Sequence, residues 1–157
     1  MKHLKNLLTR PLVNVPKWLV WVALIVAIIG FADATYLTVE HFQGVIPPCS
    51  ITSGCEKVLT SSYAEIFGIP VAIFGIIYYL VMAVGIFVYL DTKKEPVLRW
   101  TLRLSVFGFI MTLWFIYVQQ FVLHSYCQYC LTSALTSTIL FIISLVACFK
   151  YRPNIQQ

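Results

Sequence analysis

Four long apolar stretches, separated by short polar segments, dominate the pattern of hydrophobic and polar positions along the chain. Each stretch contains about 20 residues, the length that crosses roughly 30 Å of hydrocarbon as a helix. Because the connections are short, neighbouring helices are expected to pack antiparallel as a four-helix bundle. The pattern therefore predicts an all-α integral membrane protein in which residues 1–157 form a single domain, with helices at residues 18–39, 66–90, 104–123 and 127–149.

The composition agrees with this prediction. The chain is 60% hydrophobic and only 11% charged, whereas a soluble domain is about half apolar and a quarter charged. This excess of apolar side chains is too large for one small core, which argues against a soluble globular protein. The first stretch also resembles a cleaved signal peptide, because cations precede it and the small residues "ADA" occupy positions 32–34. The apolar character resumes in "TYLTV" after that site, which favours a retained helix.

The distribution of Lys and Arg predicts the orientation in the membrane. Of the 11 such residues, only Lys57 falls on one side of the predicted bundle. Since cytoplasmic loops carry the excess of Lys and Arg, both termini are predicted to be cytoplasmic and the loop between the first two helices extracytoplasmic. We expect a multi-pass protein of the inner, cytoplasmic cell membrane, and the net charge of +5 gives no support for nucleic-acid binding. The cations on the cytoplasmic side are Lys2, Lys5, Arg10, Lys17, Lys93, Lys94, Arg99, Arg103, Lys150 and Arg152.

Four of the five cysteines fall on the extracytoplasmic side in this topology. Cys49 and Cys55 lie in the loop between the first two helices, and Cys127 and Cys130 form a C-x-x-C motif at the start of the fourth. Disulfides persist in such an oxidising compartment. Cys148 lies about 27 Å further along the fourth helix and is expected to be an inert packing thiol.

A C-x-x-C motif in this position is open to three interpretations. It could contribute to a zinc site, although zinc usually requires two closely spaced pairs and the other pair here is C-x5-C. Both pairs could be permanent structural disulfides. The third interpretation is a thiol relay, because a cysteine in the first turn of a helix has a lowered pKa and is a good leaving group. The loop "VIPPCSITSGCEK" is suited to carrying a disulfide between partners.

The order of these motifs resembles the vitamin K epoxide reductase family, in its bacterial type. The resemblance rests on C-x5-C, then "VLTSSYAEIFGIP", then "FG", then C-x-x-C at the head of the last helix. It covers nearly the whole chain from Tyr36 to about Ala134. The resemblance implies a quinone-dependent protein-disulfide oxidoreductase built as a four-transmembrane-helix bundle.

The resemblance also implies a role for each cysteine. Cys130 is expected to react with a quinone bound among the helices, and Cys127 to exchange with the loop. Cys55 is then the loop cysteine that exchanges with Cys127, and Cys49 faces a soluble partner. Ser61 matches a family serine or threonine near the ring pocket, although a loop hydroxyl that caps a short helix would look the same.

The expected partners follow from the same resemblance. Many bacterial members carry a fused thioredoxin-like domain after the fourth helix, whereas this sequence ends in "YRPNIQQ", so the partner is expected to be a separate DsbA-like thioredoxin-fold protein. Such an oxidant sits near about −120 mV, which glutathione cannot reoxidise, so a membrane quinone (ubiquinone or menaquinone) is the expected acceptor. Ala134 stands where the vertebrate enzymes have a tyrosine, which makes vitamin K epoxide chemistry doubtful. No metal site is expected.

Other residues and functions stay open at this level. Asp33 is a charge within the first helix, and such residues are often functional. His124 precedes the C-x-x-C motif and could move a proton. The aromatic residues at helical spacing are either packing residues or the wall of a ring pocket: Phe74, Tyr78, Phe107 and Trp114. The alternative to the oxidoreductase is a non-catalytic membrane assembly factor or a transporter subunit with structural disulfides.

Overall fold

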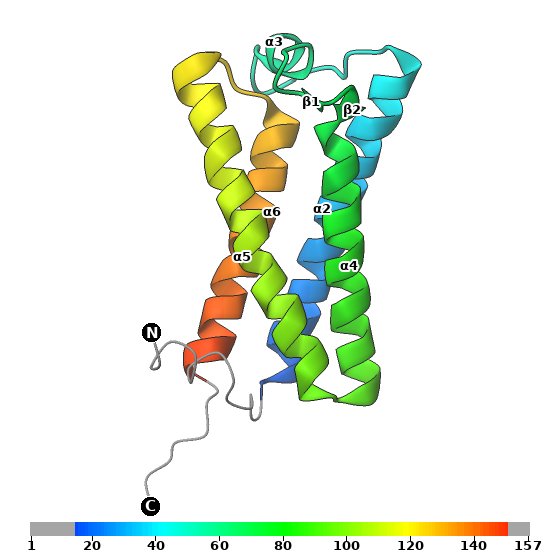
Figure 1. Ribbon diagram of the computed structural model, residues 1–157, viewed down its shortest axis with the longest axis vertical. Helices are drawn as coiled ribbons and strands as arrows, with labels where there is room; N and C mark the ends of the chain where they lie inside the picture. The colour runs from blue at the N-terminus through cyan, green and yellow to red at the C-terminus, as the bar shows by residue number, and fades with distance from the viewer. Residues whose placement is uncertain (1–14, 151–157) are drawn as a thin grey trace, which may run out of the picture.

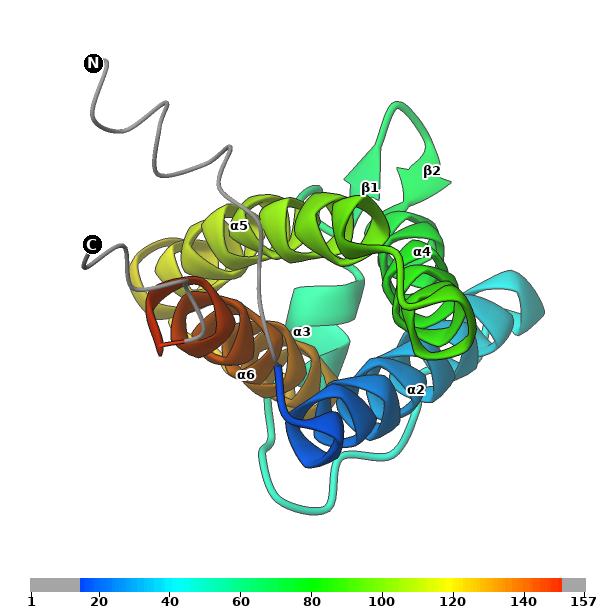
Figure 2. The same ribbon diagram turned by 90° about the horizontal axis from the view of Figure 1, so that it is seen from below.

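The computed structural model describes residues 15–150, and within them four long helices form a bundle (Figure 1). These helices are α2 (Lys17–Gln43), α4 (Val71–Thr92), α5 (Glu95–Tyr117) and α6 (Gln128–Lys150). Viewed from the end, they follow one another around a ring in the order α2, α4, α5 and α6 (Figure 2). Each is long and apolar enough to cross a membrane. The predicted all-α fold of four membrane-spanning helices is confirmed.

One end of the bundle carries a small cap, and the ends of the described chain lie at the other (Figure 1). The cap consists of a loop after α2, the short helix α3 (Cys55–Leu59), and a hairpin of β1 (Glu65–Ile66) and β2 (Ile69–Pro70). Lys57 belongs to α3, whereas the other described Lys and Arg lie towards the opposite end of the bundle, in the long helices or in the connection between α4 and α5. The predicted contributions of Lys2, Lys5, Arg10 and Arg152 lie outside the described residues.

Three helix boundaries differ from the prediction. The second helix begins at Val71 rather than at residue 66, because residues 65–70 pair as the β1–β2 hairpin. The third begins at Glu95 rather than at residue 104, with a proline in its first turn, where a missing N–H leaves no hydrogen bond unmade. The first extends to Gln43 and ends where Gly44 adopts a left-handed conformation.

The core between the helices is built from close contacts and a few hydrogen bonds. Gly30 of α2 has room for no side chain because the ring of Tyr79 from α4 occupies that space. The Tyr79 hydroxyl donates to the Ser133 carbonyl of α6 at 2.8 Å and lies 2.7 Å from the Thr136 hydroxyl. Small residues and interhelical hydrogen bonds are the usual means by which membrane helices associate. The outward faces carry exposed apolar side chains, as a lipid environment requires.

Candidate functional site

Cys49 and Cys55 form a disulfide in the cap. Their Cα atoms are 6.0 Å apart, within the range that a disulfide spans. Cys49 lies in the irregular loop after α2, and Cys55 is the first residue of α3. The Thr52 hydroxyl lies 3.3 Å from the Cys49 sulfur, inside the turn that the disulfide closes.

Cys127 and Cys130 are thiols at the beginning of α6. The sequence pattern placed both in the first turn, but Cys127 is the residue immediately before the helix and only Cys130 lies within the first turn. The backbone N–H of Cys127 donates to the side-chain Oε1 of Gln119 at 3.0 Å. Gln119 is buried in a π-helical segment, η1 (Val118–Val122), that continues α5. π-Helical turns occur frequently at functional sites.

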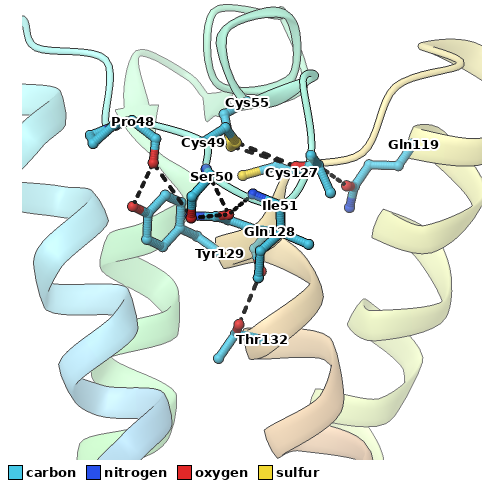
Figure 3. Close-up of a disulfide and its surroundings, with 11 residues drawn as sticks. Pro48, Cys49, Ser50, Ile51, Cys55, Gln119, Cys127, Gln128, Tyr129 and Thr132 are labelled. Carbon is cyan, nitrogen blue, oxygen red and sulfur yellow. Dashed lines mark hydrogen bonds between the residues drawn. A yellow bond between two sulfur atoms is a disulfide. The ribbon is translucent and has the colours of Figure 1, made fainter.

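The two cysteine pairs belong to one packed cluster between the cap and the beginning of α6. Cys55 and Cys127 are 2% and 0% exposed, and Cys49 and Cys130 pack beside them as partly buried neighbours. In Figure 3 the Cys127 side chain lies beside the Cys49–Cys55 disulfide. Within the loop pair, Cys49 is partly exposed and Cys55 is buried, and Cys127 is fully buried beside them. The arrangement allows exchange between the pairs while only Cys49 of the loop pair is open to the surroundings.

Gly54 is what allows the loop to lie so close to the C-x-x-C motif. A Cβ atom at this position would lie 2.7 Å from the backbone oxygen and 2.8 Å from the backbone nitrogen of Tyr126. Because those atoms belong to the backbone, they cannot move aside as a flexible side chain would. Glycine therefore permits Cys55, the next residue, to reach Cys127.

The environment of Cys127 favours its thiolate. A hydrogen bond from the Cys130 thiol lowers the pKa of Cys127 to about 7, and the backbone N–H groups of Cys130 and Tyr129 act in the same direction. Burial opposes this effect without overcoming it, as does Asp33 whenever its carboxyl is ionised. A thiol with a pKa near neutrality is about half ionised near neutral pH and leaves readily in thiol–disulfide exchange.

A cavity of about 1180 Å³ lies among the four helices beneath the cap. Cys130 faces this cavity, whereas Cys127 is not among the residues that line it. Its wall is mostly apolar and carries a few polar side chains, as is usual where a ligand with an apolar body binds. The polar side chains include Asp33, Ser61, Tyr78, Thr112, Gln119, Ser133 and Ser137.

Two features of the cavity wall fit a ring that carries polar oxygens. The Oδ2 atom of Asp33 is buried and has no hydrogen-bond partner among residues 15–150. The hydroxyls of Tyr78 and Ser137 both lie in the space that a side chain at Gly108 would occupy. Buried polar groups of this kind normally acquire a partner, which a bound ligand can supply. The residues present therefore fit a group with an apolar body and polar ring oxygens, such as a quinone.

Of the remaining residues that the sequence indicated, some line the cavity and others lie away from it. Ser61 lines the cavity, and its hydroxyl donates to the Val58 carbonyl at 2.7 Å, at the end of α3 rather than at its start. Ser61 therefore fits both interpretations, since it lines the cavity and its hydroxyl bonds to the end of a short helix, and its role stays a prediction. His124 and Trp114 do not line the cavity, whereas Phe74, Tyr78 and Phe107 do. Cys148 packs at the opposite end of the bundle with Leu98, Leu102 and Ala147.

Gln119 and Gln128 are site residues that the sequence analysis missed. Gln119 holds the backbone before α6, and Gln128 forms hydrogen bonds with the loop that carries Cys49. The available signal was the pair "QQ" at positions 119–120 within an otherwise apolar span, since polar residues inside a membrane span are frequently functional.

Comparison with known proteins identifies the family. The model of the vitamin K epoxide reductase family matches residues 21–145, which include all four cysteines of the cap. The thiol-disulfide oxidoreductase LTO1 of Arabidopsis thaliana is 32% identical over 121 residues, covering 71% of this chain and 32% of the relative. The chain thus spans about a third of the length of that relative. With most of its length matched by the family model, the chain belongs to the vitamin K epoxide reductase family.

Proposed function

We propose that this protein is a membrane thiol oxidoreductase that passes electrons from an extracytoplasmic thioredoxin-like protein of the DsbA type to a quinone. The observation that carries the proposal is the position of the four cysteines in one cluster, with Cys49 partly exposed and Cys130 facing the cavity. This order gives electrons a path from the surface to the membrane interior. The net outcome is disulfide formation in the partner and, through it, in secreted proteins.

The first step takes place at the Cys49–Cys55 disulfide. A partner thiolate attacks the sulfur of Cys49, which is the more exposed of the two, and Cys55 leaves as a thiolate. The partner's second thiol then releases the partner as a disulfide, and the loop pair is left reduced. Cys55 is buried against Cys127, so it is the loop cysteine placed to pass the electrons on.

The second step delivers the electrons to the cavity. Exchange with Cys55 reduces the C-x-x-C pair, and the hydrogen bond from Cys130 stabilises Cys127 as the thiolate. A quinone bound in the cavity would supply an acceptor for an electron pair and two protons. Cys130 faces that space, Ser61 and Tyr78 orient polar oxygens within it, and Asp33 holds a proton at its otherwise unpartnered Oδ2.

The test uses the purified protein in detergent with a reduced DsbA-type protein and a short-chain ubiquinone or menaquinone. Quinol formation is followed by absorbance, and free thiols of the partner are counted. We expect one quinol for each partner disulfide, loss of the reaction in Cys130→Ala, and retention in Cys148→Ala, which lies at the other end of the bundle. Equal loss of partner thiols with and without quinone would refute the proposal and favour a protein with structural disulfides only.

A further inference from the structure

The loop segment that carries Cys49 is held in place by polar contacts rather than by burial. Residues 48, 50 and 51 are exposed and lie outside any helix or strand, and Ile51 is 86% exposed. Apolar packing therefore contributes little to fixing this segment. The position of the exposed residues on either side of Cys49 therefore depends on the hydrogen bonds that the segment makes.

Gln128, the first residue of α6, supplies most of these bonds (Figure 3). Its Oε1 accepts from the backbone N–H groups of Ser50 at 3.2 Å and Ile51 at 3.0 Å, and from the Ser50 hydroxyl at 3.4 Å. Its Nε2 donates to the Pro48 carbonyl at 3.3 Å. A single side-chain amide thus satisfies backbone donors and a backbone acceptor on both sides of Cys49.

Tyr129 adds a second point of attachment. Its hydroxyl donates to the same Pro48 carbonyl at 3.1 Å, and its ring lies against Tyr36 of α2 with the centroids 5.4 Å apart. Gln128 and Tyr129 are the two residues between Cys127 and Cys130. Bonds from these side chains therefore connect the Cys49 loop directly to the backbone of the C-x-x-C motif.

We propose that Gln128 and Tyr129 are positioning residues that clamp residues 48–51 onto α6 and so hold the loop cysteines within reach of Cys127. This proposal deepens the relay proposed above and rests on it. The two middle residues of the C-x-x-C motif then act on exchange by fixing the distance between the pairs. The clamp holds the Cys49 side of the loop, while Gly54 sets the approach on the Cys55 side.

The clamp affects thiol–disulfide exchange between the two cysteine pairs of this chain. The Cys55 thiolate attacks the Cys127 sulfur of an oxidised C-x-x-C pair, that disulfide breaks, and Cys130 leaves as a thiolate. Cys49 then attacks Cys55 in the mixed disulfide, and Cys127 leaves as a thiolate. The loop pair becomes oxidised, the C-x-x-C pair becomes reduced, and two protons accompany the electron pair. No other oxidant or reductant is required, but Cys49 must stay in place for the second attack.

The experiment measures the effective concentration of Cys55 at Cys127. The full chain carries Cys49→Ser, Cys130→Ser and Cys148→Ala, so that only the Cys55–Cys127 disulfide can form. It is equilibrated in glutathione buffers at neutral pH, and the linked fraction is read after trapping. We expect Gln128→Ala to lower the effective concentration about tenfold and Tyr129→Phe about threefold, since fewer hydrogen bonds then order the loop.

Matched variants separate positioning from general stability. Thr132→Ala is the control, because Thr132 is exposed one turn along α6 and its hydroxyl bonds only the Gln128 carbonyl of its own helix. It should leave the effective concentration unchanged. Gln128→Glu keeps an oxygen for the two backbone N–H groups, so it should recover part of the loss.

Two results would overturn the clamp. One is an effective concentration within twofold of the parent in Gln128→Ala. The other, should that variant fail to fold, is an unchanged value in Tyr129→Phe, which keeps the ring. The measurement of effective concentration needs neither quinone nor partner. A failure of quinone reduction would therefore refute the proposed function without changing the result of this measurement.

Discussion

Gly54 shows how a single missing side chain sets the distance between the two cysteine pairs. A methyl group at this position would press on the backbone of Tyr126 and displace the segment that begins with Cys55. We expect Gly54→Ala to slow electron transfer from a protein dithiol to the quinone by about tenfold or more, because contacts below ordinary van der Waals distance force the chain to shift. The rate is compared with that of Ser53→Ala, a neighbouring exposed position, and equal rates would show that the close approach is unimportant.

The lowered pKa of Cys127 predicts the pH at which its thiolate forms. Because its pKa is lowered to about 7, the thiolate forms as the pH rises through about 7 rather than through the ordinary value of a cysteine. Removing the hydrogen-bond donor with Cys130→Ala should raise this midpoint, and exchange at neutral pH should slow accordingly. Ultraviolet thiolate absorbance during a pH titration, with Cys49–Cys55 oxidised and Cys148→Ala present, measures the midpoint. An unchanged midpoint in Cys130→Ala would contradict this explanation.

Asp33 is predicted to act on the quinone step and not on exchange. Asp33 lines the cavity, and its buried Oδ2 has no hydrogen-bond partner among residues 15–150. Because burying a charged carboxylate is costly, we expect this group to carry a proton that it can give to a bound quinone. Asp33→Asn should slow quinol formation by at least about tenfold, within the usual range for general acid–base groups. The equilibrium between Cys55 and Cys127 should stay the same. Loss of exchange and quinone reduction together would indicate a structural role instead.

At the residue scale the sequence predicted the cysteines but not the groups that position them. Composition and helix order were enough to predict that Cys49, Cys55, Cys127 and Cys130 lie at one end of the bundle, where the structure has them. Gln128 forms its bonds with residues about 80 positions away, as given by sequence separations of 77–80. The spacing of apolar and polar residues along the chain carries no information about a contact between positions so far apart. Only the folded structure reveals these hydrogen bonds.

At the scale of helices and strands, hydropathy predicted how many spans exist but not where each begins. The β1–β2 hairpin occupies residues that read as the start of the second span, because Ile66 and Ile69 are as apolar as the helix that follows. The third helix includes a charged first part, "EPVLRWTLR", which hydropathy assigned to a loop. Backbone hydrogen bonding continues through charged residues wherever water or headgroups can solvate them.

The contact between α4 and α6 allows a prediction of stability. Tyr79 connects these helices through its hydroxyl, which bonds to Ser133 and lies beside Thr136. Tyr79→Phe keeps the ring that fills the space beside Gly30 and removes only the hydroxyl. The free energy of unfolding in detergent should fall by about 1 kcal/mol. Tyr117→Phe, at an exposed ring, should leave it unchanged, and an equal effect in the two variants would argue against the interhelical bond.

At the scale of the whole molecule, the separation of charges predicts which end faces outwards. Lys57 is the one cation of the described cap, whereas the opposite end of the bundle carries six of the described Lys and Arg: Lys17, Lys93, Lys94, Arg99, Arg103 and Lys150. After reduction, Cys49 should react with a membrane-impermeant maleimide added from outside, and Cys148 should not. Cys55 should react more slowly than Cys49 because it is buried. Labelling of Cys148 first would reverse the orientation.

The complete burial of Cys127 limits which thiols can react with it directly. Cys127 offers a small thiol in solution no point of direct attack, because its side chain is 0% exposed, whereas Cys49 is partly exposed. An oxidoreductase with an open C-x-x-C motif would let any such molecule discharge the quinone pool without oxidising a protein. The cap therefore shields Cys127 from direct reaction with thiols in solution. In the proposed relay, this burial directs the oxidising equivalents of the quinone towards dithiols that react first at Cys49.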